Sequence, residues 1–336
     1  MGVNYDDVVA SFEMVLGRAP DSEEAVNYHL RLGFADRIAL GAYMCATDEF
    51  RIRHERMVAD GRAPRSRFQP EGRQRPLTVF LGDRVLTETH RGLKIYVPPT
   101  DMDLGPHILL RGIWETHVET ALLRLLRPGM QAVDVGANIG YHTLTLGAAV
   151  GPTGRVHGFE ASPNLARLVQ ASVFINGMTP WVTIHNQAVL DQAGTVTLAS
   201  QPDHFGSGNI VPPGAEAAYH SDYSSQIQVP GIALDAVLGA GPPLDLIRID
   251  IEGSEPQALR GAARLIERSP ALRIVTEWSV GMMAARSDVG GFVAWLQGMG
   301  FRFWLVNAEG GFDPLAADQL PGLPHSDLLI SRQDPA

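Results

Sequence analysis

The stretch VDVGANIG, residues 133–140, decides the fold class of this chain. Its apolar start is typical of a buried strand, and the glycines after Asp134 allow a tight turn into a helix. Gly136 and Gly140 let the backbone approach a ligand closely, and the first unpaired amides of the next helix favour an anionic group. Asp134 offers the opposite charge, which suits a ligand ammonium. The stretch therefore predicts a ligand-binding turn between a strand and a helix.

Strand-like runs alternate with helical ones through the rest of the chain. The strand-like runs are QAVDVG, RVHGFE, VTIHNQAV, LDLIRIDI, RIVTEW and FRFWLV. This alternation predicts βαβ units, and hence an α/β fold with a mostly parallel sheet and helices on both of its faces. Ligands of such sheets bind beyond the carboxyl ends of the strands. The candidate site residues are therefore those that end each strand.

The second and third strands end in polar residues that suit a nucleoside. Glu160 follows Asp134 by about 26 residues, near the spacing at which an acidic residue reaches a ribose. The alternative for Glu160 is a structural role, because residues 162–163, Ser-Pro, can start a helix without any ligand. After the third strand come Asn186, Gln187 and Ala188. These residues either meet an adenine edge or fix their own loop.

The fourth and fifth strands end in acidic residues. The run IRIDIEGSE, residues 247–255, carries Asp250 and Glu252, which lie on the same side of a strand because side chains alternate. RIVTEW brings Glu277 to a comparable level. Neighbouring carboxylates cost free energy unless a proton, a cation or a substrate compensates them. We expect Asp250, Glu252 and Glu277 to be catalytic, or to be the ligands of any divalent metal; a helix N-cap near Ser254 and a structural cation are the alternatives.

Two other functional classes stay open at this point. An NAD-dependent oxidoreductase expects the glycine pattern GxGxxG, whose middle glycine is replaced by Asn138. A non-catalytic protein could keep a nucleotide-binding fold for binding or assembly. Carboxylates at the strand ends argue against this second class.

Composition and charge restrict the partners. A net charge of −10 argues against sequence-independent binding to nucleic acid, which depends on cations that neutralise phosphates. The single cysteine, Cys45, allows no intrachain disulfide, and the first residues, MGVNYDDVVASF, lack the basic patch and apolar run that are typical of a signal peptide. No apolar run approaches membrane-spanning length. We therefore expect a cytoplasmic protein with no membrane span, whose oligomeric state the sequence leaves open.

The composition divides the chain into two domains joined by a linker. Residues 1–58 carry helical periodicity, and residues 59–76 are rich in Gly, Pro and Arg, as in a solvated linker. Residues 77–336 form the second domain, which opens with two strand-like segments, LTVFLGDRVL and GLKIYVP, expected to be antiparallel. A helix is expected near residues 114–126.

Three helices are expected in the first domain. The first ends at Gly17, the second runs from Asp21 to Gly33, and the third covers residues 37–57. The residues of the third helix expected to face inward are Ile38, Tyr43, Phe50 and Met57.

The segment from Gln201 to Gln228 is polar and low in regular pattern. This composition suits either a lid that contacts substrate or a long surface loop. In a lid, the aromatic residues Tyr219, His220 and Tyr223 could contact a sugar ring.

The order of these motifs resembles one known family, the FkbM-like S-adenosylmethionine-dependent methyltransferases. The resemblance covers about residues 105–332 and rests on VDVGANIGYHT, GFEASP, HNQAV, GSGN, LDAVL, IRIDIEGSEPQALRGA and VTEW. It implies a Rossmann-like methyltransferase sheet that ends in an antiparallel hairpin formed by FRFWLV and SDLLISR. VLGRAPDSEE, near the start of the chain, resembles a small helical module of unassigned function.

The resemblance also implies roles for the candidate residues. The cofactor pocket would contain Asp134, Gly136, Asn138, Gly140, Glu160, Asn186, Gln187 and Ala188. S-adenosyl-L-methionine is then the cofactor, and the acceptor is a hydroxyl of a sugar, a glycan or a related natural product. A hydroxyl needs a base, for which Asp250, Glu252 and Glu277 are the candidates. The histidines His142, His185 and His204 are alternatives. Arg248 stands where the family often has Lys, and it is expected to act through charge or structure only.

Overall fold

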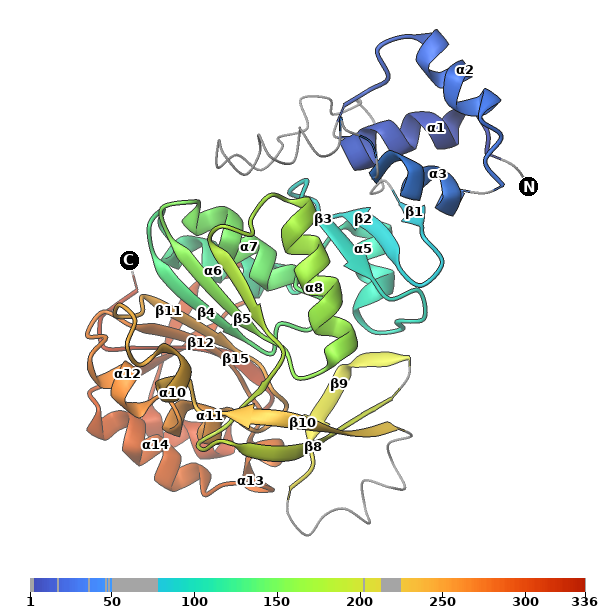
Figure 1. Ribbon diagram of the computed structural model, residues 1–336. Coiled ribbons are helices and arrows are strands. Elements are labelled where there is room, and N and C mark those ends of the chain that lie inside the picture. Colours follow the sequence, from blue (N-terminus) through green and yellow to red (C-terminus); the bar gives the residue numbers. More distant parts are fainter. Residues whose placement is uncertain are drawn as a thin grey trace. The chain divides into compact units, whose positions relative to one another are not determined.

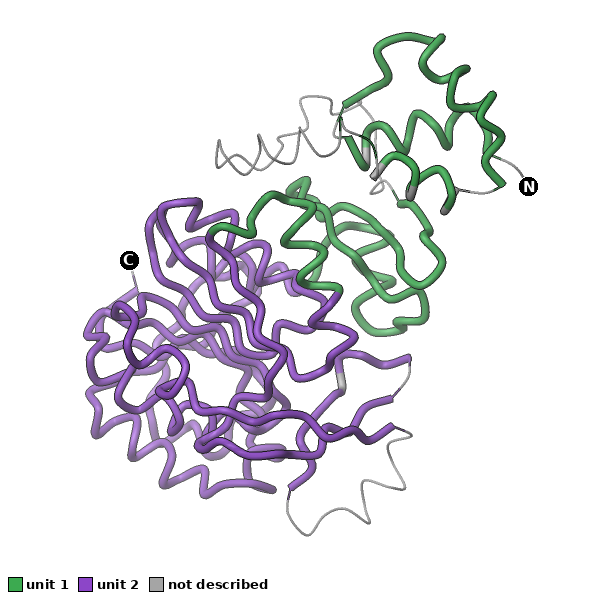
Figure 2. The backbone as a smooth tube through the Cα atoms, viewed as in Figure 1, with its two compact units in different colours: residues 1–114, 168–180 green, residues 115–167, 181–336 purple. Residues whose placement is uncertain are grey.

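In the computed structural model, the described residues are 3–16, 18–35, 37–45, 47, 49, 78–201, 203–212 and 225–335. The chain divides into two compact units, residues 1–114 with 168–180 and residues 115–167 with 181–336 (Figure 2). The predicted linker, residues 59–76, lies outside the described residues. The predicted domain boundaries stay predictions.

The first unit starts with short helices that bury one apolar face each. They are α1 (Tyr5–Ser11), a π-helical turn (Phe12–Leu16), α2 (Glu23–Arg31) and α3 (Arg37–Cys45). Their core contains Val8, Phe12, Val26, Leu40 and Met44. This confirms helical structure over the described part of residues 1–58.

Two details of the predicted helices were wrong. Ser22, not Asp21, is the N-cap of α2, because its hydroxyl accepts a hydrogen bond from the amide of Ala25 at 3.2 Å. Tyr43 was expected to face inward but is 37% exposed, since Leu40 and Met44, four residues apart, occupy the buried face of α3. The side chains of Ile38, Phe50 and Met57 lie outside the described residues.

The first unit continues with a small antiparallel sheet, as expected. It consists of β1 (Val79–Phe80), β2 (Val85–Glu88) and β3 (Lys94–Val97), followed by α5 (Leu104–Arg111). The last part of α8 (Pro163–Ile175) belongs to this unit. There the Ser172 hydroxyl accepts from the Tyr96 amide at 3.0 Å, which ties the helix to β3.

The second unit contains a large, mostly parallel sheet (Figure 1). Its strands are β4 (Gln131–Val135), β5 (Arg155–Phe159), β6 (Val182–His185), β11 (Leu246–Ile249), β12 (Arg273–Trp278), β13 (Arg302–Val306), β14 (Phe312–Leu315) and β15 (Ser326–Ser331). The order is β14-β13-β15-β12-β11-β4-β5-β6. Five neighbouring strands are parallel, namely β6, β5, β4, β11 and β12. In contrast, β15 runs antiparallel to β12 and β13. The predicted sheet, including its antiparallel C-terminal pair, is confirmed.

Helices cover both faces of this sheet. α6 (Thr116–Leu125) and α7 (Tyr141–Val150) contact one face, the face of Asp134, whose carboxylate accepts a hydrogen bond from Thr143 of α7. The other face, the face of Val133, packs in one apolar core with α10 (Leu234–Leu238), α11 (Glu255–Arg260), α12 (Ala263–Glu267) and α14 (Val289–Gly298). The described residues also include α13 (Val280–Ala284) and a 3-10 helix (Ala317–Gly322). None of the described helices is both long enough and apolar enough to cross a bilayer.

A second sheet is inserted between β6 and β11. It consists of β7 (Ala188–Val189), β8 (Gly194–Gln201), β9 (His204–Ile210) and β10 (Ser225–Ile232), in the order β7-β10-β8-β9. The expectation that residues 201–228 lack regular structure was therefore wrong for β9 and for the first half of β10, residues 225–228. The reason is that β8 pairs antiparallel with both strands, and backbone pairing does not require the apolar alternation that β9 lacks.

Candidate active site

The turn after β4 has the left-handed backbone that its sequence predicts. Gly136, Asn138 and Gly140 have φ values of +82°, +50° and +92°. A Cβ atom at Gly136 would lie 1.9 Å from the carbonyl oxygen of Asp250. Gly136 is therefore required by the close approach of the chain that follows β11, in addition to any ligand. Gly140 is the N-cap of α7, and it provides no side-chain hydrogen bond to the first turn of this helix.

Glu160, at the end of β5, accepts hydrogen bonds from backbone amides on both sides. Its Oε2 accepts from the Asn138 amide at 2.7 Å, and its Oε1 accepts from the Ser162 amide at 2.8 Å. Burial raises the pKa of Glu160 to about 7. This geometry fits the structural alternative, although each carboxylate oxygen has a further lone pair for a ribose hydroxyl. The ribose contact stays a prediction.

The three residues after β6 have different surroundings. Asn186 Nδ2 donates to the carbonyl oxygens of Glu160 and Ala161, both at 2.9 Å, and so fixes this loop. Gln187 is half-buried. Ala188 lies in β7 and packs in a small apolar cluster. A contact between these residues and an adenine stays a prediction.

Asp134 is fully buried beneath the turn. Its Oδ2 accepts from the Thr143 hydroxyl at 2.5 Å, and its Oδ1 lies 3.5 Å from Arg248 Nη1. Protein groups therefore compensate this carboxylate, and the predicted contact with a ligand ammonium stays a prediction.

Arg248 links the chain segments that meet at this edge of the sheet. Its Nη1 donates to the Gly136 carbonyl at 2.9 Å, and its Nη2 donates to Asp250 Oδ2 at 2.6 Å. Glu115 Oε2 lies 3.7 Å from the same Nη2. The side chain is only 7% exposed, and the charges of Asp250, Asp134 and Glu115 outweigh burial and raise the pKa of Arg248. Arg248 is thus the permanent cation of a buried ionic network, in agreement with the expected electrostatic or structural role.

Residues of α6 and of the turn before it enter this network, and they were not candidates from the sequence. Glu115 Oε2 and His142 Nε2 are 3.0 Å apart. Burial acts to raise the pKa of Glu115, but the hydrogen bond and charge of His142 and the charge of Arg248 lower it to about 2. His117 Nε2 lies 2.8 Å from Asp327 Oδ2 on β15, and this carboxylate raises the pKa of His117. Because Glu115 and His117 precede β4 and end no strand, the strand-end rule could not identify them.

The histidines considered as alternative bases lie in three different environments. His142 is buried, and no described residue forms a hydrogen bond with its Nδ1. The His185 ring stacks on the Phe159 ring at a centroid distance of 4.4 Å. His204 is exposed, with its Nδ1 3.1 Å from Asp203 Oδ1.

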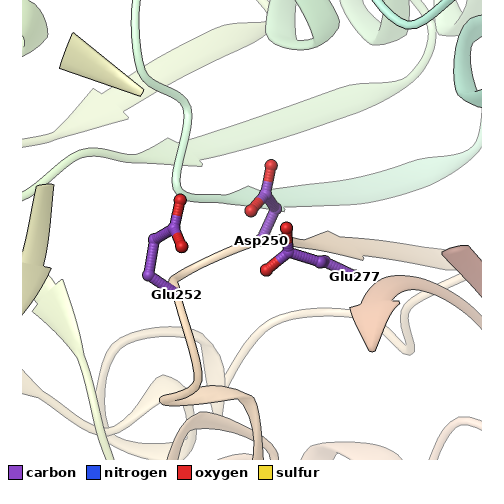
Figure 3. Close-up of side chains that lie close together, drawn as sticks. All are labelled: Asp250, Glu252 and Glu277. Atoms are coloured by element: carbon purple, nitrogen blue, oxygen red, sulfur yellow. The ribbon is translucent and has the colours of Figure 1, made fainter. Parts of the chain in front are cut away.

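Asp250, Glu252 and Glu277 come together, and Figure 3 shows their carboxylates pointing toward one another. One oxygen from each lies within 4.8 Å of the others. Burial and the charges of Asp250 and Glu252 raise the pKa of Glu277 to about 9. Burial also raises the pKa of Asp250, against the opposing effect of Arg248. Such an oxygen-rich set could hold a divalent cation, as Mg²⁺ and Ca²⁺ prefer oxygen ligands.

Two features of Glu277 and Glu252 distinguish them from Asp250. Glu277 Oε2 is buried and has no hydrogen-bond partner among the described residues, while its Oε1 lies 3.5 Å from His325 Nε2. Glu252 has a φ of +56°, which is uncommon for a residue other than glycine and is typical of functional loops. The predicted substrate contacts Tyr219, His220 and Tyr223 lie outside the described residues.

Solved structures similar to this one include methyltransferases of low sequence identity. An S-adenosylmethionine-dependent O-methyltransferase from Thermotoga maritima is 12% identical, with 74% of this chain and 77% of that chain covered at a TM-score of 0.37. An O-methyltransferase from Bacillus cereus, in complex with S-adenosylhomocysteine, is 14% identical, with 66% and 82% covered at a TM-score of 0.39. No curated protein matches the chain.

A family match covers the turn, the strand ends and the three carboxylates together. Residues 134–303 match the methyltransferase FkbM domain, which is half of the chain. This match sets aside the oxidoreductase alternative. The chain belongs to the FkbM family of S-adenosylmethionine-dependent methyltransferases.

Proposed function

We propose that this protein transfers a methyl group from S-adenosylmethionine to a hydroxyl group of a sugar, a glycan or a related natural product. The observation that carries this proposal is the cluster of Asp250, Glu252 and Glu277 within 4.8 Å, at the sheet edge where the turn after β4 also lies. A hydroxyl is a poor nucleophile while it holds its proton, so its methylation needs a base or a cation beside the oxygen.

The residues around the turn fit S-adenosylmethionine. The uncapped first turn of α7 suits the methionyl carboxylate, and Glu160 suits the ribose hydroxyls. Asn138 Oδ1 is buried and has no hydrogen-bond partner in the part of the chain that the structure describes, so it can accept a hydrogen bond from a ligand. The three clustered carboxyl groups ionise most readily beside a positive charge, which suits a ligand that carries a sulfonium. When bound, the cofactor supplies the activated methyl group.

Glu277 is the strongest candidate for the base. At Asp250, burial raises the pKa, but the ion pair with Arg248 at 2.6 Å opposes this rise. With a pKa of about 9, Glu277 is a strong base once it is ionised, and its Oε2, which has no hydrogen-bond partner among the described residues, offers a position for the incoming proton. Glu277 gives up its own proton most readily when a positive charge lies beside the cluster, because an opposite charge lowers the pKa of a carboxyl group.

Asp250 and Glu252 complete the arrangement. Their oxygens can orient the acceptor hydroxyl, or they can bind a divalent cation together with Glu277. We propose that Tyr219, His220 and Tyr223 contact the acceptor, as the sequence predicts. Deletion of residues 212–224 should then abolish methylation and leave the affinity for S-adenosylhomocysteine nearly unchanged. Unchanged turnover after this deletion would contradict the acceptor role.

The proposed function is tested by transfer of isotope-labelled methyl groups. The purified full chain is incubated with labelled S-adenosylmethionine and a panel of glycans and small hydroxylated compounds, with and without Mg²⁺ and a chelator. We expect label in a product whose mass rises by one methylene and whose methyl group is bound to oxygen. Label bound to nitrogen or carbon would contradict the proposed O-methylation, and binding of the cofactor without any transfer would favour the non-catalytic alternative.

A further inference from the structure

Strand β9 of the inserted sheet is tied at both of its ends. Near its start, Asn138 Nδ2 donates to the Phe205 carbonyl oxygen at 3.0 Å. At its end, Arg286 Nη2 donates to Asn209 Oδ1 and to the Ile210 carbonyl oxygen, both at 3.1 Å. Figure 1 shows β9 in the inserted sheet, beside β8. β9 therefore runs from the turn after β4 to the chain that follows α13.

The segment at the second end of β9 packs on the loop that carries Glu252. Gln257 Nε2, from α11, donates to the Arg286 carbonyl at 3.2 Å, and Arg286 Nη1 donates to the Met282 carbonyl at 3.1 Å. The Met282 backbone is so close to Gly253 that a Cβ atom there would lie 2.6 Å from it. One end of β9 is thus linked to the turn after β4. The other end is linked, through Arg286 and Met282, to the loop that carries Glu252.

Asn138 forms hydrogen bonds with two different partners. Its side chain contacts β9, and its backbone contacts Glu160. Its amide donates to Glu160 Oε2 at 2.7 Å, while its side-chain amide holds Phe205. Its φ of +50° is one that asparagine and glycine tolerate better than other residues. A glycine would satisfy the backbone equally well, so the backbone alone does not explain the asparagine.

We propose that Asn138 is a positioning residue that couples occupancy of the cofactor turn to β9, and that β9 is a wall of the acceptor site. The inference rests on the proposed function and extends it, because it names the strand against which a hydroxylated acceptor is held beside the carboxylates. A ligand that orders the turn would, through Asn138, also order the start of β9. Acceptor binding then becomes tighter once the cofactor is in place, as two sites coupled through one element require.

The test is hydrogen exchange of the full chain with and without S-adenosylhomocysteine, which needs no knowledge of the acceptor. The variants are Asn138→Gly, which keeps the backbone and removes the tie, and Asn138→Asp, which replaces the donor with an acceptor. The matched control is Gln228→Ala, which removes an exposed 2.8 Å hydrogen bond to Thr197 within the same sheet.

In the unchanged protein we expect S-adenosylhomocysteine to slow exchange in residues 134–142 and also in residues 203–212. With S-adenosylhomocysteine at a concentration that saturates each variant, so that a weaker affinity does not matter, the first effect should remain in both Asn138 variants. The second effect should fall by about fivefold, the factor that one hydrogen bond contributes. Gln228→Ala should behave like the unchanged protein. Two results would overturn the coupling alone. In the first, residues 203–212 stay protected in both Asn138 variants. In the second, the unchanged protein shows protection of residues 134–142 but not of residues 203–212. Protection of neither segment would overturn the proposed cofactor site as well.

Discussion

Two groups of carboxylates meet at the same edge of the main sheet, and they differ in how their charge is compensated. In the first group, Asp134, Glu115 and Asp250 surround the guanidinium of Arg248 at distances of 2.6 to 3.7 Å. In the second group, Asp250, Glu252 and Glu277 face one another, and one buried oxygen of Glu277 forms no hydrogen bond with any residue that the structure describes. Asp250 belongs to both groups.

This difference separates a structural role from a chemical one. A buried cation links chain segments and favours the ionised form of Glu115, whose pKa is lowered to about 2. Carboxylates that face one another bind a proton or a cation instead, as the pKa of Glu277, about 9, indicates. We therefore expect removal of Arg248 to affect stability, and removal of the Glu277 charge to affect the reaction.

The largest effect is expected from Arg248→Met. This change leaves Asp134 and its neighbours buried without their cation, and such a loss typically costs about 3–5 kcal/mol in the free energy of unfolding. Urea denaturation measures the cost. The matched control is Arg264→Met, because Arg264 is 78% exposed and its pair with Asp235 should contribute less than about 1 kcal/mol. Equal losses in the two variants would show that the Arg248 network is not structural.

The next effect is expected from Glu277→Gln. Removal of a general base lowers turnover by about 100-fold or more, which corresponds to about 2.7 kcal/mol in the activation free energy. The unfolding free energy at pH 7 should hardly change, because glutamine resembles the protonated form that a pKa of about 9 favours at that pH. Steady-state rates and urea denaturation measure the two effects.

The control for Glu277→Gln is Glu267→Gln, which changes an exposed glutamate of α12. It should leave both turnover and stability unchanged. Full turnover in Glu277→Gln would exclude Glu277 as the base. A large loss of stability would place Glu277 with the structural carboxylates instead.

The smallest effect is expected in the pH dependence of stability through Glu160. Its pKa is about 7 in the folded protein against 4.5 for the group itself, so the folded state binds the proton more tightly. The stability from this proton is fully present below pH 4.5 and is lost as the pH rises through about 7. Between pH 5 and 7 the loss is about 2 kcal/mol.

Glu160→Gln removes this titration, so its unfolding free energy should fall less steeply over the same pH range. The comparison uses the slope, since glutamine also loses one acceptor for the amides of Asn138 and Ser162. An unchanged slope would mean that Glu160 titrates in the folded protein as it does in the unfolded chain.

Much of the fold was predictable from the sequence because local pattern determines it. Apolar runs that alternate with helical segments predicted the parallel strands. Because Glu160, Asp250 and Glu277 follow or end such strands, they were predicted to lie at one edge of the sheet. β9 was missed because HFGSGNI has little side-chain preference for a strand, and pairing with β8 forms it. Tyr43 was misplaced since helical periodicity alone does not decide which face is buried.

The candidate site was predictable only in part, because its carboxylates are compensated by residues distant in sequence. Glu115 reaches Arg248 across 133 positions of the chain, through the packing of α6 on the sheet. No spacing rule covers such a contact. Asp134 was likewise predicted at a strand end. The sequence could not indicate that its carboxylate accepts a hydrogen bond from Thr143 and forms an ion pair with Arg248.

The central claim is that the turn after β4 and the three carboxylates form one site. The most direct test is a crystal structure of the full chain with S-adenosylhomocysteine. We predict that its carboxylate lies at the start of α7, its ribose at Glu160, and its sulfur on the side of Asp250 and Glu277. A ligand bound at another edge of the sheet, or a sulfur separated from these carboxylates by protein, would contradict the claim.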